Sequence, residues 1–228
     1  MRTRLACAAL LVVAALAAGC MGDGSSTEDE FAGEMTFEDD FGDDSNWPAG
    51  TQGGIIRGIF AGAYQMEFQA LQSLTVGPNE LFLKGRLTIA DSVQSVDVRS
   101  ETEESPSVGL LCRWNEEGLD KLTAYGFVVR KTGDGRSAWN LNRSVDGKTE
   151  SLARGNADVD PGEDRVTLEA SCVGDTLTFR IDGEEVASVT DTEIGSGING
   201  LVGVTAGDQQ PPLAATFDNY VLEYDPET

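Results

Sequence analysis

The sequence predicts an all-β fold, an antiparallel sandwich or barrel, on three observations. Short segments in which apolar and polar residues alternate recur along the chain at close, regular spacing. Turn residues, with Asp182-Gly183 as the clearest example, separate these segments. Helical periodicity is nearly absent, and the best helical candidate, Ala61 to Ser73, fits a strand equally well.

The expected strands follow one another through the domain. They are Met35 to Phe41, Leu81 to Asp91, Val93 to Arg99, Val108 to Trp114, Ala124 to Lys131, Ala138 to Val145, Arg165 to Val173, Thr176 to Asp182, Val186 to Asp191, Leu201 to Ala206 and Ala214 to Tyr224. Gly133-Asp134-Gly135 and Pro161-Gly162 supply further turns. Many short strands joined by such turns are typical of antiparallel sheets that bury one face.

The phase of each strand predicts which side chains enter the core. In the hairpin near the C-terminus, alternation assigns Cys172, Leu177 and Phe179 to the buried face. Asp182-Gly183 joins two alternating runs and predicts a two-residue turn in which both residues have positive φ. Trp114 shares the phase of Cys112, so we expect it in the core or at its edge.

The N-terminus has the pattern of an export signal. Arg2 and Arg4 precede an apolar run, Leu5 to Ala18, that is too short to cross a bilayer as a stable helix. The run ends LAAGC and resembles the bacterial lipobox, although Ala17 stands where leucine is most usual. The resemblance implies cleavage before Cys20 and a lipid on its thiol. The alternative is an ordinary secretory signal with a chance cysteine.

These features divide the chain into three parts. Residues 1–19 are the expected lipoprotein signal peptide, 20–33 the lipidated cysteine with a flexible tether, and 34–228 the β domain. The tether begins MGDGSSTED, which is small, polar and without a strand pattern. We therefore expect a protein that is anchored in the cell membrane by its lipid and faces the extracytoplasmic side.

The cysteines of the domain predict a disulfide. Cys7 leaves with the signal and Cys20 carries the lipid, which leaves Cys112 and Cys172 as a pair in an exported chain. A bond between them closes a loop of about 60 residues, which the chain-entropy description values at roughly 4 kcal/mol. Two free, buried thiols are the alternative.

Charge and composition exclude several classes of function. The chain has 39 Asp and Glu against 16 Lys and Arg, a formal net charge of −23, which repels nucleic acid. It contains no histidine. Serine-histidine-aspartate triads, cysteine-histidine pairs and histidine-bearing zinc sites are therefore excluded.

Four segments together resemble the concanavalin A-like lectin/glucanase superfamily. They are LLCRW (Leu110 to Trp114), ASCVGDTLTFRIDGEEVASVTD (Ala170 to Asp191), GINGLVGVTAG (Gly197 to Gly207) and ATFDNYVLEY (Ala215 to Tyr224). Within it they are similar to LamG-like and 3-keto-disaccharide hydrolase-type domains of bacterial lipoproteins. The resemblance implies an antiparallel jelly-roll β-sandwich in which FEDDF, Phe37 to Phe41, pairs with the last strand. It does not fix an activity, because lectins, glucanases, keto-sugar hydrolases and adhesion modules share this fold.

The acidic residues do not form a glucanase pattern. A glucanase of this fold carries Glu-x-Asp-x-x-Glu on one strand, and retaining chemistry needs two carboxyl groups about 5 Å apart. That spacing is absent. The clusters Glu101 to Glu104, Glu116-Glu117 and Glu184-Glu185 fall in predicted loops and turns, where we expect solvated charges.

The predicted ligand-binding residues are Arg113, Arg130, Trp139, Asn140 and Asn142. Asn140 and Asn142 share one face of their strand and can bond sugar hydroxyls, with the two arginines nearby if the strands pair. The alternative is the polar outer face of an ordinary sheet and, for Trp139, a place in the core.

The resemblance also suggests a structural calcium ion, since Ca²⁺ is common in the superfamily and takes oxygen ligands. Asp40 and Asp218 are the candidate ligands, because the first and last strands are expected to be neighbours. The alternative for Asp218 is a bend residue that accepts backbone N–H bonds.

The sequence thus favours a non-catalytic domain that binds a carbohydrate or another cell-envelope ligand, such as an envelope protein. Two alternatives remain, a glycoside-cleaving enzyme of the 3-keto-disaccharide hydrolase type and a purely structural envelope protein. An enzyme predicts two acids within about 5–9 Å of each other in a cleft.

Overall fold

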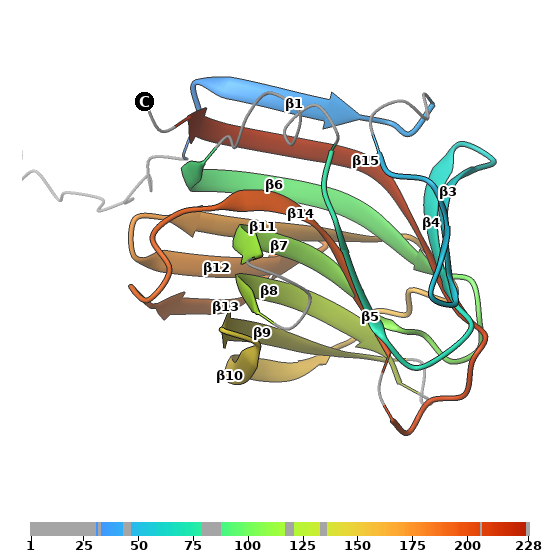
Figure 1. Ribbon diagram of the computed structural model, residues 1–228. Coiled ribbons are helices and arrows are strands. Elements are labelled where there is room, and N and C mark those ends of the chain that lie inside the picture. Colours follow the sequence, from blue (N-terminus) through green and yellow to red (C-terminus); the bar gives the residue numbers. More distant parts are fainter. Residues whose placement is uncertain are drawn as a thin grey trace, which may run out of the picture. The chain divides into compact units, whose positions relative to one another are not determined.

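Two antiparallel sheets pack face to face in the computed structural model, which describes residues 31, 33–42, 47–78, 88–116, 121–132, 136–205 and 207–226 (Figure 1). The larger sheet has the order β13 (Glu184–Thr190), β12 (Thr176–Ile181), β11 (Val166–Val173), β6 (Ile89–Ser100), β15 (Leu213–Pro226), β4 (Ala63–Phe68), β3 (Ile55–Phe60) and β2 (Gly50–Gln52), with β1 (Met35–Asp39) also on β15. The other has the order β10 (Lys148–Ala157), β9 (Ser137–Val145), β8 (Leu122–Lys131), β7 (Ser107–Glu116), β14 (Ile198–Val204) and β5 (Ser73–Val76). The predicted all-β sandwich is confirmed.

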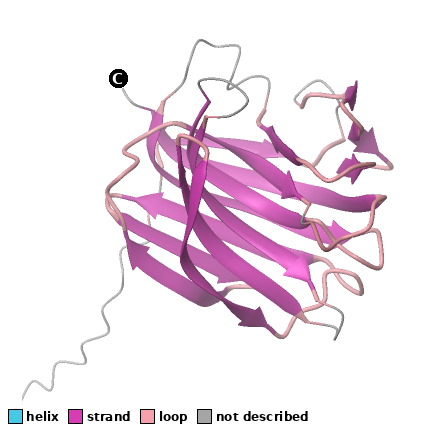
Figure 2. Cartoon of the chain, turned by 60° about the horizontal axis from the view of Figure 1, so that its bottom comes forward, coloured by secondary structure: helices cyan, strands magenta, loops and turns pink. Residues whose placement is uncertain are grey.

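The described residues form strands and loops only (Figure 2). No helix in that part of the chain has the length and hydrophobicity needed to cross a bilayer. The predicted signal peptide, Cys20 and almost all of the tether lie outside the described residues, as do the turn at 133–135 and most of the strand expected from Leu81. These remain predictions.

Strand β15 joins the two ends of the domain. One of its edges pairs with β6 along almost its whole length, and the other is divided between β4 and β1. Asp39 of β1 lies opposite Tyr220 of β15, so the predicted neighbourhood of the first and last strands is confirmed.

The hairpin β12–β13 has the predicted geometry. Ile181 pairs with Glu184 across a two-residue turn, in which φ is 50° at Asp182 and 79° at Gly183. Leu177 and Phe179 are fully buried, as alternation predicts. Local turn chemistry and a period of two residues were sufficient for β12. The one register shift in this pairing leaves Val186 of β13 as the extra residue and does not change which residues form the turn.

The core lies between the sheets and contains a disulfide. Cys112 of β7 and Cys172 of β11 are bonded across the sandwich with their Cα atoms 6.7 Å apart, and both are fully buried. The bond thus links the two sheets directly and confirms the predicted pairing. At one end of the core, the rings of Trp47, Tyr64 and Tyr220 pack together, with centroids 5.2–5.6 Å apart.

The structure contains strands that the sequence analysis left ambiguous or did not predict. The ambiguous segment from Ala61 to Ser73 contains β4, a strand. Strand β10, with the sequence KTESLARGNA, was missed because polar residues occupy both of its faces. The Asp146-Gly147 turn before it, with φ of 50° and 75°, is the signal that marks it as the partner of β9.

Candidate functional site

A hollow of about 960 Å³ lies on the outer face of the six-stranded sheet. Its position follows from the alternation of β8. Tyr125 and Phe127 point into the core and are fully buried, so Gly126, Val128 and Arg130 point the opposite way and line the hollow. Strands β7, β9, β10 and β14, together with Ser73 of β5, complete the lining.

The floor of the hollow is apolar. Leu111, Ala124 and Val202 line it, and together with Trp114 they form a small buried cluster separate from the main core. Gly126 has no positive φ, and a Cβ atom added to it would lie 3.5 Å from Leu111 Cδ2, an ordinary contact distance. The backbone therefore does not require glycine at this position. Because Gly126 has no side chain, the floor of the hollow stays open there.

Polar side chains stand around this floor. The cross-strand register places Asn140 of β9 between Val128 and Arg154, and Asn142 between Gly126 and Ser151. The Ser151 hydroxyl donates a 2.6 Å hydrogen bond to Asn140 Oδ1. This bond fixes the amide of Asn140 and leaves its Nδ2 group to donate to a ligand.

Four of the five residues predicted to bind ligand border the hollow: Arg130, Trp139, Asn140 and Asn142. The side chains of the two asparagines and of Arg130 lie on the outer face of the six-stranded sheet. Arg154, which the sequence did not single out, joins them because β10 is the neighbour of β9. The Asp146-Gly147 turn would have indicated this strand, but it was not among the predicted turns.

Trp139 borders the hollow, but its ring packs toward the core. The ring meets Phe179 of the opposite sheet edge-on, with centroids 6.3 Å apart. Gly155 lies across from it on β10, and a Cβ atom there would come within 2.6 Å of the indole. The ring is therefore held between the sheets, as the core alternative for this residue expected.

Arg113 is not at the hollow, and the reason is a bulge in β7. Cys112 pairs with Tyr125 and Asn115 with Thr123, so two residues of β7 oppose the single Ala124 of β8. The extra residue, Arg113, has a φ of 51°. The bulge reverses the phase of the strand, which turns Arg113 inward and places Trp114 in the small cluster with Leu111, Ala124 and Val202 instead of the main core.

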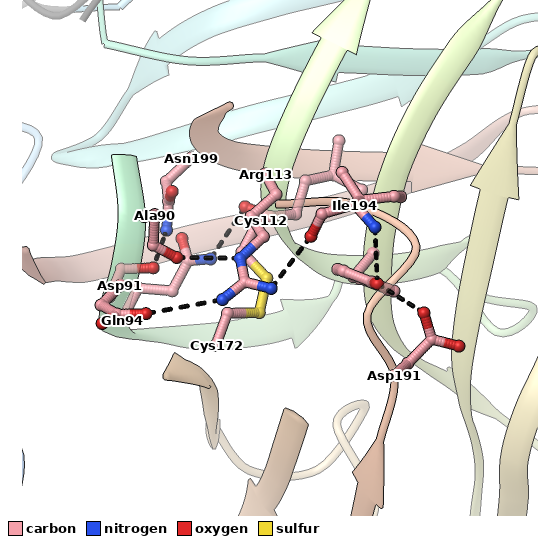
Figure 3. Close-up of a disulfide and its surroundings, with 12 residues drawn as sticks. Ala90, Asp91, Gln94, Cys112, Arg113, Cys172, Asp191, Ile194 and Asn199 are labelled. Carbon is pink, nitrogen blue, oxygen red and sulfur yellow. Dashed lines mark hydrogen bonds and ion pairs between the residues drawn. A yellow bond between two sulfur atoms is a disulfide. The ribbon is translucent and has the colours of Figure 1, made fainter. Parts of the chain in front are cut away.

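The buried guanidinium of Arg113 instead ties loops to the core beside the disulfide (Figure 3). It donates hydrogen bonds to the carbonyl oxygens of Ala90 at 2.8 Å, Ile194 at 2.9 Å and Gly174 at 2.6 Å, and lies 3.5 Å from the carboxylate of Asp91. Only 3% of Arg113 is exposed. This residue has a structural role in place of the predicted ligand contact.

A second network attaches the loop before β14 to the six-stranded sheet. The Tyr125 hydroxyl and Arg143 Nη1 each donate to the Asp191 carboxylate at 2.6 Å. Burial raises the pKa of Tyr125 to about 12, and its hydrogen bond to Asp191 adds to the effect. Desolvation alone would raise the pKa of Asp191, but bonds from Tyr125 and the Glu193 N–H, with the Arg143 charge, bring it below its ordinary value.

The described lining of the hollow contains no catalytic pair of acids. None of the described residues that line it carries a carboxylate. Asp208 lies 3.4 Å from Arg130 Nη1 and is largely exposed. The paired acids that glycoside hydrolysis requires are thus not found in the described lining.

The two predicted calcium ligands have separate protein partners. Asp218 accepts hydrogen bonds from Arg165 and from the Asn219 N–H, and Asp40 accepts one from the Gly42 N–H. In the described ranges, no three acidic or cysteine side chains gather in a way that could hold a metal ion. The contact to the Asn219 N–H agrees with the bend alternative for Asp218.

The sequence matches no protein-family model and no curated protein. Among solved structures, the domain is similar to the carbohydrate binding module CBM66 from Bacillus subtilis, with 14% identity and a TM-score of 0.53 over 81% of this chain and 92% of that one. The domain is also similar to the Bacillus licheniformis beta-glucanase, with 11% identity and a TM-score of 0.55 over 84% of this chain and 98% of that one. A third similar structure is a Bacillus subtilis protein of unknown function with a galectin-like fold. It has 12% identity and a TM-score of 0.57 over 82% of this chain and 94% of that one.

The domain has the concanavalin A-like fold. At identities this low, the likeness establishes the fold and leaves the function to the residues of the site. The narrower likeness to LamG-like and 3-keto-disaccharide hydrolase-type domains stays a prediction.

Proposed function

We propose that this domain binds carbohydrate in the hollow of the six-stranded sheet without cleaving it. The lining carries the proposal: amide and guanidinium groups surround an apolar floor, and no carboxylate stands among its described residues. An apolar floor suits the C–H face of a sugar ring, and a few placed polar groups fix its hydroxyls. The similarity to a carbohydrate binding module supports the same proposal.

We also propose that a lipid on Cys20 anchors the protein in the cell membrane, with the β domain on the extracytoplasmic side. The LAAGC sequence and the disulfide between Cys112 and Cys172 support this location, because disulfides persist in oxidising compartments. Mass spectrometry of the membrane fraction tests it. A soluble protein with an unmodified Cys20 would contradict it.

A glycan microarray probed with the full chain, followed by calorimetric titration of the glycans that bind, tests the binding function. The Gly126→Leu variant tests the place of binding, since a leucine there fills the floor of the hollow without a backbone clash. We expect its affinity to fall at least about tenfold, a loss of about 1.4 kcal/mol, while its melting temperature stays near that of the parent.

Gly195→Leu is the matched control. Gly195 is exposed, has no positive φ, and a Cβ atom added to it would meet nothing within 4 Å. The Gly195→Leu variant adds the same side chain away from the hollow, so its affinity for the glycan should equal that of the parent. Equal affinities of the folded Gly126→Leu variant and the parent would remove the hollow as the site, and a failure to bind any glycan at millimolar protein would refute the function.

A further inference from the structure

The charge of the hollow is opposite to that of the chain that forms it. The chain has 39 acidic residues against 16 basic ones. Yet the charged groups among the described lining residues are Arg130 and Arg154, with no acidic partner in the lining. In a chain with this excess of acids, a cationic cavity marks a place where a negative group on a ligand would be stabilised.

The two arginines face the same hollow from strands that flank β9. Arg130 of β8 lies beside Ala138, and Arg154 of β10 lies beside Asn140, two residues further along β9. Two strand spacings and two residues of rise put their Cα atoms roughly 12 Å apart. Side chains as long as arginine can converge on one ligand across that distance from either side of Asn140.

Most arginines elsewhere in the domain are held by acids, whereas Arg154 is not. Arg143 bonds Asp191 and Glu150, and Arg180 bonds Glu169 and Glu185. Arg154 is exposed and makes no ion pair or hydrogen bond with any described residue. Its five N–H donors are therefore available to a ligand.

Among the described residues, Arg130 pairs with one exposed acid. Its Nη1 lies 3.4 Å from Asp208, whose side chain is 71% exposed. An exposed pair of this kind contributes little to stability, so an anionic ligand can replace it at little cost. The planar guanidinium fork fits carboxylate, sulfate and phosphate oxygens in pairs, which strengthens and orients such contacts.

From this arrangement we infer that the hollow selects a glycan that carries anionic groups, carboxylates or sulfates, over its neutral counterpart. The inference rests on the proposed carbohydrate binding and names the chemical class of its ligand. Arg154 and Arg130 bind the anionic groups, while Asn140 Nδ2 donates to an oxygen between them and the apolar floor takes the face of the ring.

Two pairs of polysaccharides, each with one charged and one neutral member on the same backbone, test the inference on the full chain. Polygalacturonate is compared with its methyl-esterified form, and dextran sulfate with dextran. We expect one or both charged members to bind at least about tenfold more tightly than their neutral partners, since hydrogen bonds to charged groups are stronger than those between neutral groups. The two pairs also separate a carboxylated ligand from a sulfated one.

Arg154→Gln and Arg130→Gln should each lower the affinity for the charged member about tenfold, and Arg154→Lys should restore part of it because the charge remains. Arg99→Gln is the control, since Arg99 is also exposed but lies on β6 of the other sheet. Equal loss in the control would show a general charge effect and overturn the inference.

The outcomes distinguish this inference from the function on which it rests. Binding of neutral and charged members with equal affinity, or unchanged affinity in a folded Arg154→Gln variant, overturns the anionic selectivity and leaves carbohydrate binding intact. If no glycan in either pair or on the microarray binds, the proposed function fails and the selectivity fails with it.

Discussion

Replacing Arg113 by alanine should destabilise the domain strongly without touching the hollow. The guanidinium holds three backbone carbonyls, those of Ala90, Gly174 and Ile194, which belong to three separate segments. Alanine leaves these acceptors without their donor in a region from which water is largely excluded, and leaves Asp91 without its cation. Unpaired buried acceptors are costly because they give up their bonds to water.

The expected loss in the free energy of unfolding is about 3–5 kcal/mol, the usual effect of removing one member of a buried charged network. Three bonds at about 1.5–3 kcal/mol each would give more, but the desolvation of the buried arginine offsets part of their gain. For a domain of this size, the loss corresponds to a fall in melting temperature of roughly 10 °C.

Urea denaturation of the full chain at pH 7, without reductant, measures the effect, and Arg113→Gly is the informative control. At a φ of 51°, alanine is strained by roughly 1–2 kcal/mol and glycine is not. The glycine variant should therefore be the more stable of the two, although both lose the three bonds. The difference should be smaller than the strain itself, because glycine loses more backbone entropy on folding than alanine does. If Arg113→Ala unfolds within about 1 kcal/mol of the parent, the guanidinium does not hold these segments.

Two further perturbations test the network at Asp191 and the disulfide. The folded pKa of Asp191 lies below its ordinary 3.8, so its carboxylate adds stability above that pH and the contribution is lost as the pH falls through the folded pKa. Acid titration of unfolding should show Asp191→Asn less stable than the parent at pH 7 and converging with it at low pH; a constant difference would contradict the assignment. Exchanging Cys112 and Cys172 for serine should cost about 4 kcal/mol for the 60-residue separation, seen as a lower urea midpoint. An unchanged midpoint would mean that the bond does not constrain the unfolded chain.

Most of the scaffold could be predicted from the sequence, because turn residues and the alternation of apolar and polar residues are local signals. The turn at Asp182-Gly183 and the alternation around it depend on residues next to one another, and the structure reproduces them. The pairing of Cys112 with Cys172 followed from elimination, on the expectation that the chain is exported. Neither required knowledge of which strands become neighbours.

The site was less predictable because it depends on pairing between strands. Asn140 and Asn142 were found by their shared phase, but Arg154 enters the hollow only because β10 lies beside β9. Strand β10 contains few apolar residues, so it lacks the pattern by which buried strands are recognised. Its turn chemistry at Asp146-Gly147 would have revealed it, since such a turn specifies a hairpin whatever the strands contain.

The bulge at Arg113 explains why the sequence analysis assigned both Arg113 and Trp114 to the wrong face of β7. Alternation assigns Arg113 outward and Trp114 inward, and a single extra residue in β7 exchanges the two. The exchange gives the scaffold a buried cation that binds the carbonyls of three segments. It also adds Trp114 to the apolar cluster of Leu111, Ala124 and Val202, the three members that line the hollow. One backbone irregularity thus supports both the stability of the sandwich and the shape of its proposed binding surface. Deleting the residue would therefore disturb the core and the hollow together, whereas Arg113→Gly, which keeps the bulge, should weaken only the core.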